Sequence, residues 1–172
     1  MDCYESLLKV LQNEARFQSG EANVFFIGPT KVGKSTLAWT LCFETPDVYL
    51  VPVQASKWIK EQYSAASFAS YPEYVAFLTQ KSRELLAKDP DCAVKRIKQS
   101  FNCCGGGCLI EGVRNPRDFM QLFDYRKDLV VFLSRNGMEV VNEFEEGIEV
   151  IKQYVKWLEK NFEGKFSMEV EL

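Results

Sequence analysis

The sequence predicts an α/β fold of three layers, α/β/α, with a mostly parallel sheet between two layers of helices. Short runs of β-branched and aromatic residues alternate with longer segments of helical periodicity, and this alternation is typical of parallel strands joined by helices. The length of 172 residues and the hydrophobic content of 47% fit one domain over 1–172. Within it we expect an N-terminal helix in 1–20, a core over 23–133, and a C-terminal helix and tail over 144–172.

Apolar spacing predicts each element in the first half of the chain. Apolar residues three or four apart along 2–18 favour an amphipathic helix, and Val-Phe-Phe-Ile at 24–27 favours a buried strand. A second strand is expected over 48–53, where Pro52 limits hydrogen bonding to a sheet edge or a strand end. Helices are expected over 36–43, over 56–66 and from Pro72 onward, the last with Val75, Leu78, Leu85 and Leu86 facing inward.

The second half continues the alternation. Asp89 is expected to cap a helix that has Pro90 at its first position, and Asn115-Pro116 predicts another helix start. Two further strands are expected, one from Cys108 that ends at Glu111 and one over 129–133. The helix from Pro90 has an expected apolar stripe of Val94, Ile97 and Phe101, and the helix from Pro116 has one of Phe119, Leu122 and Phe123. A long helix is expected over 144–161, with its apolar stripe formed by Phe144, Ile148, Ile151, Val155 and Leu158. Alternating residues over 166–172 fit either a last edge strand or a loose tail.

The segment from Gly28 to Thr36 reads G-x-x-x-x-G-K-S-T between the first strand and the following helix. Glycines at these two positions let the backbone approach an anion closely, so that N–H groups and the helix N-terminus point at a phosphate. A lysine can then reach the β- and γ-phosphates, and a serine hydroxyl can bind Mg²⁺. The alternative is a purely structural role, in which the glycines form a turn before a helix that begins with a basic residue. The order of strand, loop and helix favours a phosphate-binding loop. The predicted nucleotide-binding residues here are Gly28, Lys31, Gly33, Lys34, Ser35 and Thr36.

A second segment carries a family resemblance. The run Cys108-Leu-Ile-Glu-Gly-Val-Arg-Asn-Pro-Arg-Asp118 resembles the strand, acidic residue, Val-Arg and helix start of P-loop nucleotide kinases. It is most similar to deoxynucleoside monophosphate kinases and adenylate kinase-like proteins, and the similarity covers 23 to about 133, including the helical run 81–86. The resemblance implies a P-loop NTPase fold of the nucleoside monophosphate kinase type. It also implies ATP as donor, Mg²⁺ as cofactor, and a nucleotide as the small-molecule acceptor.

By that resemblance Glu111 takes the place of the acidic Walker B residue, and with Ser35 it would hold Mg²⁺ and its water shell. Lys34, Glu111 and Arg114 are then the predicted catalytic residues, and Arg114 would also bind the acceptor phosphate. Arg83 and Arg96 are acceptor-side candidates. Each has a plainer alternative: Glu111 could cap the next loop, Arg114 could pair with Glu111 or Asp118, and Arg83 and Arg96 could line a solvated helix face.

The sequence departs from this family after the strand over 129–133. Monophosphate kinases usually carry an arginine-bearing lid there, whereas the segment 134–143 contains one arginine, Arg135. Arg135 could stack on adenine, replace one lid arginine, or be an exposed turn residue. Arginines that close over phosphates supply a large part of phosphoryl transfer. A nucleotide-binding module without kinase activity therefore remains the alternative to a kinase. A GTPase or ATPase switch is disfavoured because neither N-K-x-D nor D-x-x-G follows the loop.

Composition bounds the partners. A net charge of −3 gives no overall basic field for nucleic acid, and no apolar run approaches the roughly 20 residues that span a bilayer. The first residues lack a signal-peptide pattern, so a cytoplasmic protein is expected, of undetermined oligomeric state. Cys103, Cys104 and Cys108 surround three glycines, and we expect a turn with incidental thiols rather than a metal or redox site, because the chain has no histidine and the spacing suits no common zinc site.

Overall fold

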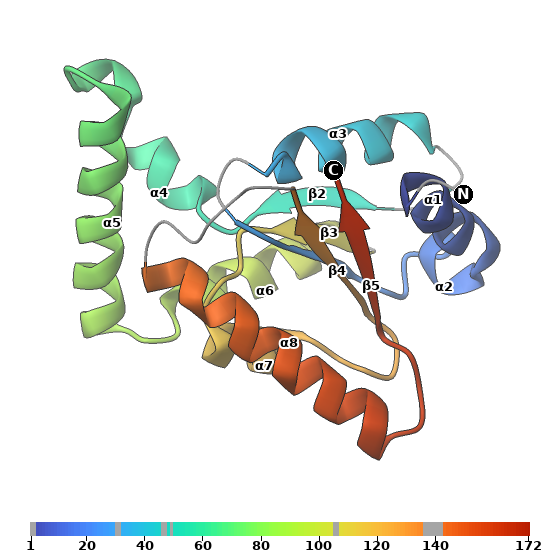
Figure 1. Ribbon diagram of the computed structural model, residues 1–172. Coiled ribbons are helices and arrows are strands. Elements are labelled where there is room, and N and C mark those ends of the chain that lie inside the picture. The colour runs from blue at the N-terminus through green and yellow to red at the C-terminus, as the bar shows by residue number, and fades with distance from the viewer. Residues whose placement is uncertain (1–2, 30–31, 46–47, 49, 105–106, 136–142) are drawn as a thin grey trace.

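The computed structural model contains one five-stranded, all-parallel sheet in the order β2-β3-β1-β4-β5 (Figure 1). It describes residues 3–29, 32–45, 48, 50–104, 107–135 and 143–172. The strands are β1 (Val24–Ile27), β2 (Val51–Gln54), β3 (Cys108–Glu111), β4 (Leu129–Ser134) and β5 (Ser167–Glu171).

Helices cover both faces of this sheet, so the α/β prediction is confirmed and the layering agrees with three layers. Alternate residues of β1 point to opposite faces of the sheet: Val24 and Phe26 pack in one core cluster, and Phe25 and Ile27 pack in the other. Burial on both faces accounts for the continuous apolar runs read in the sequence. One face carries α1 (Cys3–Asn13), α2 (Ala15–Gln18) and α3 (Lys34–Glu44), and the other carries α6 (Cys92–Cys104), α7 (Pro116–Leu122) and α8 (Glu143–Asn161).

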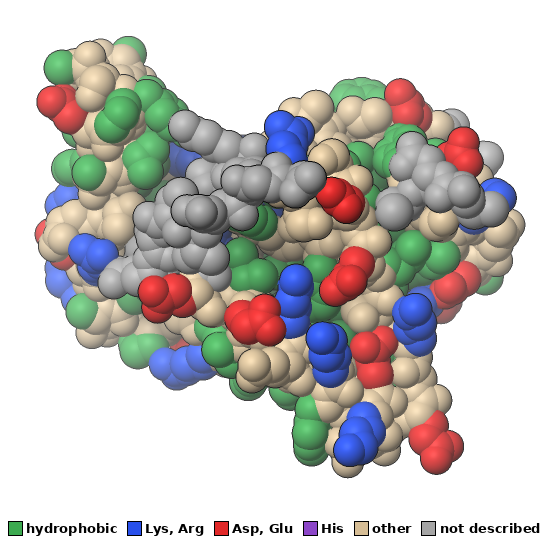
Figure 2. All heavy atoms as spheres, viewed as in Figure 1, with side chains coloured by type: hydrophobic (Ala, Val, Ile, Leu, Met, Phe, Trp, Pro, Cys, Tyr) green, Lys and Arg blue, Asp and Glu red, His purple; other side chains and the backbone are tan. Residues whose placement is uncertain are grey.

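Between β2 and β3 the chain forms a separate helical arm. It consists of α4 (Lys57–Gln62), a 3-10 turn η1 (Ala65–Ser67) and α5 (Tyr71–Lys88), and α5 stands beside the sheet in Figure 1. The arm has its own small core around Ile59, Tyr74 and Leu78. Val75 was expected to face inward, but it is 39% exposed because Tyr74 takes the buried position of that turn. Hydrophobic side chains gather over α5 on the face shown in Figure 2.

Several boundaries differ from the expectation. The helix over 2–18 is broken at Glu14, whose extended backbone separates α1 from α2. Strand β2 begins at Val51 rather than at 48, and α4 stops at Gln62. Asp89 ends α5, since its N–H bonds to the Leu85 carbonyl, and its side chain accepts a hydrogen bond from the Asp91 N–H at 3.1 Å, as expected of a cap. The helix that follows nevertheless begins only at Cys92, two residues after Pro90.

The other elements keep the expected positions. The helix after the glycine loop, α3, extends over 34–44. Helix α7 starts at Pro116 with Asn115 as its N-cap, and the Asn115 side chain accepts a hydrogen bond from the Arg117 backbone N–H. Of the two alternatives for 166–172, the edge strand is correct, because β5 pairs with β4. The side chains of Cys103, Cys104 and Phe144 lie outside the described residues.

Candidate functional site

The carboxyl ends of the strands meet at one edge of the sheet. Phe26 of β1 is in register with Glu111 of β3, Ile27 with Phe132 of β4, and Ser134 with Glu171 of β5. The residues that follow these strands therefore gather at the same edge, which is where ligands bind in open parallel sheets. They include the glycine loop after β1, the turn after Glu111, Arg135 and Leu172.

Both motif glycines of the loop occupy positions where a residue with a Cβ would clash or be strained. A Cβ on Gly28 would lie 2.6 Å from the Leu133 carbonyl oxygen of β4, so only glycine lets the loop leave β1 at this point. Gly33 has φ = 109° and forms the N-cap of α3, a left-handed conformation that favours glycine. Lys31 and Thr30, between them, lie outside the described residues.

Lys34 is the first residue of α3, and its side chain turns back over the loop. The side chain is buried, and Nζ donates hydrogen bonds to the carbonyl oxygens of Gly28 at 2.8 Å and Pro29 at 2.6 Å. The first N–H groups of a helix have no partner within it, so the start of α3 offers donors beside this ammonium. Thr36, also in this first turn, is exposed.

Ser35 and Glu111 connect the loop to the neighbouring strand. Ser35 Oγ donates a hydrogen bond of 2.7 Å to Oε1 of Glu111, across 76 residues of sequence. Glu111 is only 5% exposed, and its second oxygen, Oε2, is buried without a hydrogen-bond partner among the described residues. Glu111 thus faces the glycine loop and the start of α3, and among the described residues it does not cap its own turn. A hydroxyl and a carboxylate with a spare oxygen form a donor set that suits Mg²⁺, which takes its remaining ligands from water and phosphate.

Arg135 and Leu172 lie beside the loop. An Nη atom of Arg135 is 3.6 Å, and a methyl carbon of Leu172 is 3.5 Å, from the position that a Cβ on Gly33 would occupy. Arg135 is exposed, and Leu172 is held there because its N–H donates to the Ser134 carbonyl oxygen at 2.8 Å. Sequence reasoning missed Leu172. The alternation over 166–172 signalled a strand, but only the parallel pairing with β4 shows which edge its end reaches.

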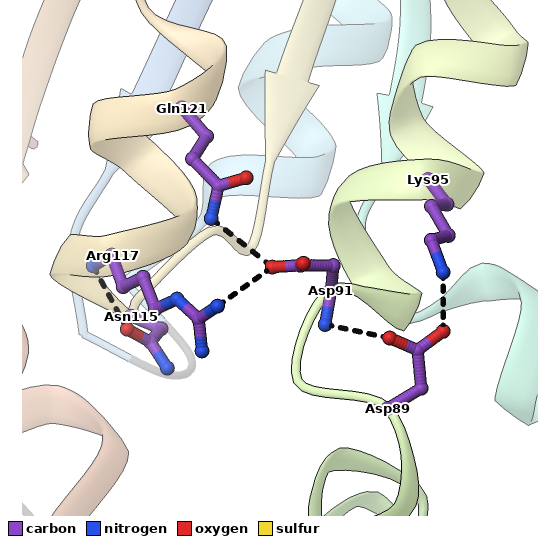
Figure 3. Close-up of polar contacts among 6 residues, drawn as sticks. All are labelled: Asp89, Asp91, Lys95, Asn115, Arg117 and Gln121. Atoms are coloured by element: carbon purple, nitrogen blue, oxygen red, sulfur yellow. Dashed lines mark hydrogen bonds and ion pairs between the residues drawn. The ribbon is translucent and has the colours of Figure 1, made fainter.

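The turn after β3 carries Arg114, which is half-buried. Gly112 has φ = 87°, and Val113 is buried in the core. Beyond the turn, α7 is attached to the residue before α6 (Figure 3). Asp91 accepts hydrogen bonds from the side chains of Arg117 at 3.1 Å and Gln121 at 3.2 Å. The turn that presents Arg114 is therefore anchored on both sides.

The other two candidate arginines lie on the surface of separate elements. Arg83 is exposed on α5, in the helical arm. Arg96 is exposed on α6 and lines a cavity of about 380 Å³ together with residues of β2 and α4, among them Gln54, Lys57 and Glu61. Neither Lys34 nor Glu111 lines that cavity. The structure therefore brings together Gly28, Gly33, Lys34, Ser35, Glu111, Arg135 and Leu172, and Arg114 lies on the turn three residues after Glu111.

Within the cysteine cluster only the side chain of Cys108 is described, and it is buried at the start of β3. Within the described ranges no group of three or more histidine, cysteine or acidic side chains is arranged to hold a metal ion. No helix in this part of the chain is long and apolar enough to cross a bilayer. Acidic and basic side chains are interspersed over the face shown in Figure 2.

Comparisons with known proteins identify no family. No protein-family model matches the chain, and no curated protein matches its sequence.

Proposed function

We propose that this chain binds Mg-ATP at the edge formed by Gly28–Thr36 and Glu111, and transfers a phosphoryl group to a nucleoside or deoxynucleoside monophosphate or a similar small acceptor. The hydrogen bond between Ser35 and Glu111 is the observation that carries the proposal. It joins two segments far apart in the sequence, one expected to bind Mg²⁺ from the loop motif and the other from the family resemblance. A chance glycine-lysine-serine match would give no reason for a buried carboxylate to face its serine.

The donor side follows from the loop. An ammonium can exchange carbonyl oxygens for phosphate oxygens, so Lys34 is placed to contact the β- and γ-phosphates once a nucleotide lies against the start of α3. Ser35 and Glu111 would hold Mg²⁺, whose charge neutralises the phosphate oxygens during transfer. Arg135 and Leu172 lie beside Gly33, so they are candidates to contact the adenine base of the nucleotide. A planar guanidinium stacks on an aromatic ring, and a leucine offers an apolar surface.

The acceptor side is represented by Arg114. In the proposed reaction an acceptor phosphate oxygen attacks the γ-phosphorus while the bond to the β–γ bridging oxygen breaks, leaving ADP. Transfer of this kind needs positioning and charge stabilisation more than covalent chemistry from the protein. Arg114 can supply both to the acceptor phosphate, because a guanidinium binds two phosphate oxygens at once.

The nucleotide-binding module without kinase activity is the second candidate function. Two features favour it. The segment 134–143 contains a single arginine, Arg135, and the cavity that Arg96 lines includes no residue of the glycine loop. A panel of ribo- and deoxyribonucleoside monophosphates, incubated with Mg-ATP and assayed for ADP and diphosphate products, separates the two. Product with at least one acceptor supports the kinase. ATP binding with no product supports the module.

Calorimetry tests the part that both candidates share. Wild-type protein should bind ADP or ATP in the presence of Mg²⁺, and Lys34→Ala should weaken that binding sharply. An absence of nucleotide affinity, or equal affinity in Lys34→Ala, would contradict the phosphate-loop interpretation itself. Lys9→Ala, on the exposed surface of α1, is a control for loss of an unrelated ammonium.

A further inference from the structure

Helix α8 contains a glycine in its interior, at Gly147, where glycine is ordinarily unfavourable. Its surroundings explain it. A Cβ at this position would clash with the carbonyl oxygen of Arg114 and would lie 2.9 Å from Cδ of Pro116. The backbone of α8 therefore rests directly on the turn that presents Arg114, and any side chain at this position would displace either the helix or the turn.

The turn has supports on its other sides as well. Gly112, with φ = 87°, lies against Ala55, whose N–H donates to the Glu111 carbonyl oxygen at 2.9 Å. Val113 is buried in the core, and the Asn115 side chain caps α7. These contacts fix the residues before and after Arg114. The Gly147 contact is made at the Arg114 carbonyl itself, so it bears most directly on where that residue lies.

We infer that Gly147 is a positioning residue for Arg114: α8 holds the turn after β3 so that the guanidinium faces the acceptor phosphate. The inference rests on the proposed function for its consequence, since a misplaced Arg114 matters to catalysis only if Arg114 binds the acceptor. A displacement of about 1 Å in such a group can cost on the order of 100-fold in rate. Gly147 touches no substrate in this scheme and acts only through the turn.

The first test is the sign of a stability change. Replacing an interior helical glycine with alanine ordinarily stabilises a protein of this size, raising Tm by about 2–4 °C. Because the Cβ of Gly147→Ala would clash with the backbone carbonyl oxygen of Arg114, we expect Tm to fall instead. A rise in Tm would overturn the inference. Glu149→Ala, at an exposed position of the same helix, controls for a change of helix propensity alone.

The second test observes Arg114 without any substrate. In ¹⁵N-labelled protein the Nε–Hε signal of Arg114 can be identified by its loss in Arg114→Lys. We expect that signal to shift in Gly147→Ala and to stay in place in Glu149→Ala. If Gly147→Ala does not fold cooperatively, Ile148→Ala is the second variant, because it removes packing next to the contact instead of adding a clash. Its control is Leu158→Ala, buried on α8 but remote from the turn. An unmoved Arg114 signal in the folded variant overturns the inference.

The third test links position to function. With an accepted monophosphate, Gly147→Ala should raise the acceptor KM by about tenfold or more, while the Kd for ADP changes little. In an Arg114→Ala background the same change should have no further effect on KM, because its route through Arg114 is gone. An unchanged KM in Gly147→Ala overturns the inference while leaving the kinase proposal intact. If wild-type protein phosphorylates nothing, the kinase proposal fails, and the Tm and Arg114 signals still decide whether Gly147 positions the turn.

Discussion

Removing the Ser35 hydroxyl should destabilise the protein and abolish the effect of Mg²⁺ on nucleotide binding. In Ser35→Ala the Glu111 carboxylate loses its Oε1 partner at 2.7 Å and stays buried, with Oε2 already lacking one among the described residues. Hydrogen bonds to charged groups contribute about 1.5–3 kcal/mol net. Because Ser35 itself is exposed, we take the lower end. For a chain of this length, about 1.5 kcal/mol corresponds to a fall in Tm of about 3–6 °C.

A double-mutant cycle isolates the pair. Glu111→Ala alone removes the buried carboxylate and leaves Ser35 free to bond water, and the double variant removes both partners. We expect a coupling free energy of about 1.5 kcal/mol between the two positions, measured by thermal or denaturant unfolding without nucleotide. Thr40→Ala is the matched control on α3, since the Thr40 hydroxyl donates a hydrogen bond to the Thr36 carbonyl oxygen of the same helix.

The functional half of this prediction is measured by titrating ADP with and without Mg²⁺. Wild-type and Thr40→Ala protein should bind ADP more tightly with Mg²⁺, whereas Ser35→Ala and Glu111→Gln should show nearly equal affinities in both conditions. Glu111→Gln keeps an oxygen acceptor for Ser35 but removes the charge, so it separates metal binding from packing. A full Mg²⁺ effect in both variants, or zero coupling in the cycle, would refute the assignment of this pair as the magnesium-binding groups.

The remaining predictions concern stability and metal content. Burial, reinforced by nearby Asp91, raises the pKa of Asp118 to about 6. The stability that the protonated Asp118 carboxyl contributes is therefore present below about pH 4 and lost as the pH rises through 6. Asp118→Asn should stabilise the protein at pH 7 by about 2–3 kcal/mol, and its free energy of unfolding should vary less with pH between about 4 and 6. Asp128, whose pKa is also raised to about 6, accepts backbone N–H bonds at both oxygens, so Asp128→Asn should destabilise instead, and equal effects of the two variants in denaturant unfolding would contradict this reasoning. Gly28→Ala should cost about 1–3 kcal/mol through its clash with β4 and weaken ADP binding, and an unaltered unfolding curve would show that the loop can shift. Elemental analysis should find no stoichiometric zinc bound at 103–108; zinc that is lost in a triple Cys→Ser variant would show this expectation to be wrong.

Local patterns carried most of the fold prediction, because the spacing of apolar residues along the chain shows which face of each element must be buried. Strand β1 matches its expected bounds, and β3 ends at Glu111 as expected, since each is a short apolar run buried on both faces. The errors occur where two neighbouring preferences compete. Pro90 was assigned to the first turn of a helix, whereas Asp89 continues the hydrogen bonding of α5 and delays α6 by two residues.

The candidate site was predicted in part for the same reason. The residues of the loop are adjacent in the chain, so their spacing alone suggested the chemistry. Leu172 and Gly147 could not be assigned, since their importance depends on contacts with Gly33 and Arg114 that no local pattern encodes. Gly147 did leave a signal. A glycine inside a strongly amphipathic helix has a cost, and the usual reason for tolerating it is a backbone that approaches closely.

Strand order is the remaining link between fold and site. Adjacent strands lie about 4.8 Å apart, so a residue at the end of an immediate neighbour of β1 is within side-chain reach of the first turn of α3. One intervening strand would double that separation to about 10 Å, which exceeds the length of a glutamate side chain. The alternation of strands and helices is compatible with either order. Only the observed pairing of β1 with β3 places Glu111 against Ser35, and the same pairing puts β2, with its Pro52, at the edge. The chemistry proposed for this chain therefore depends as much on the pairing of β1 with β3, in a sheet of buried apolar strands, as on the glycine loop itself.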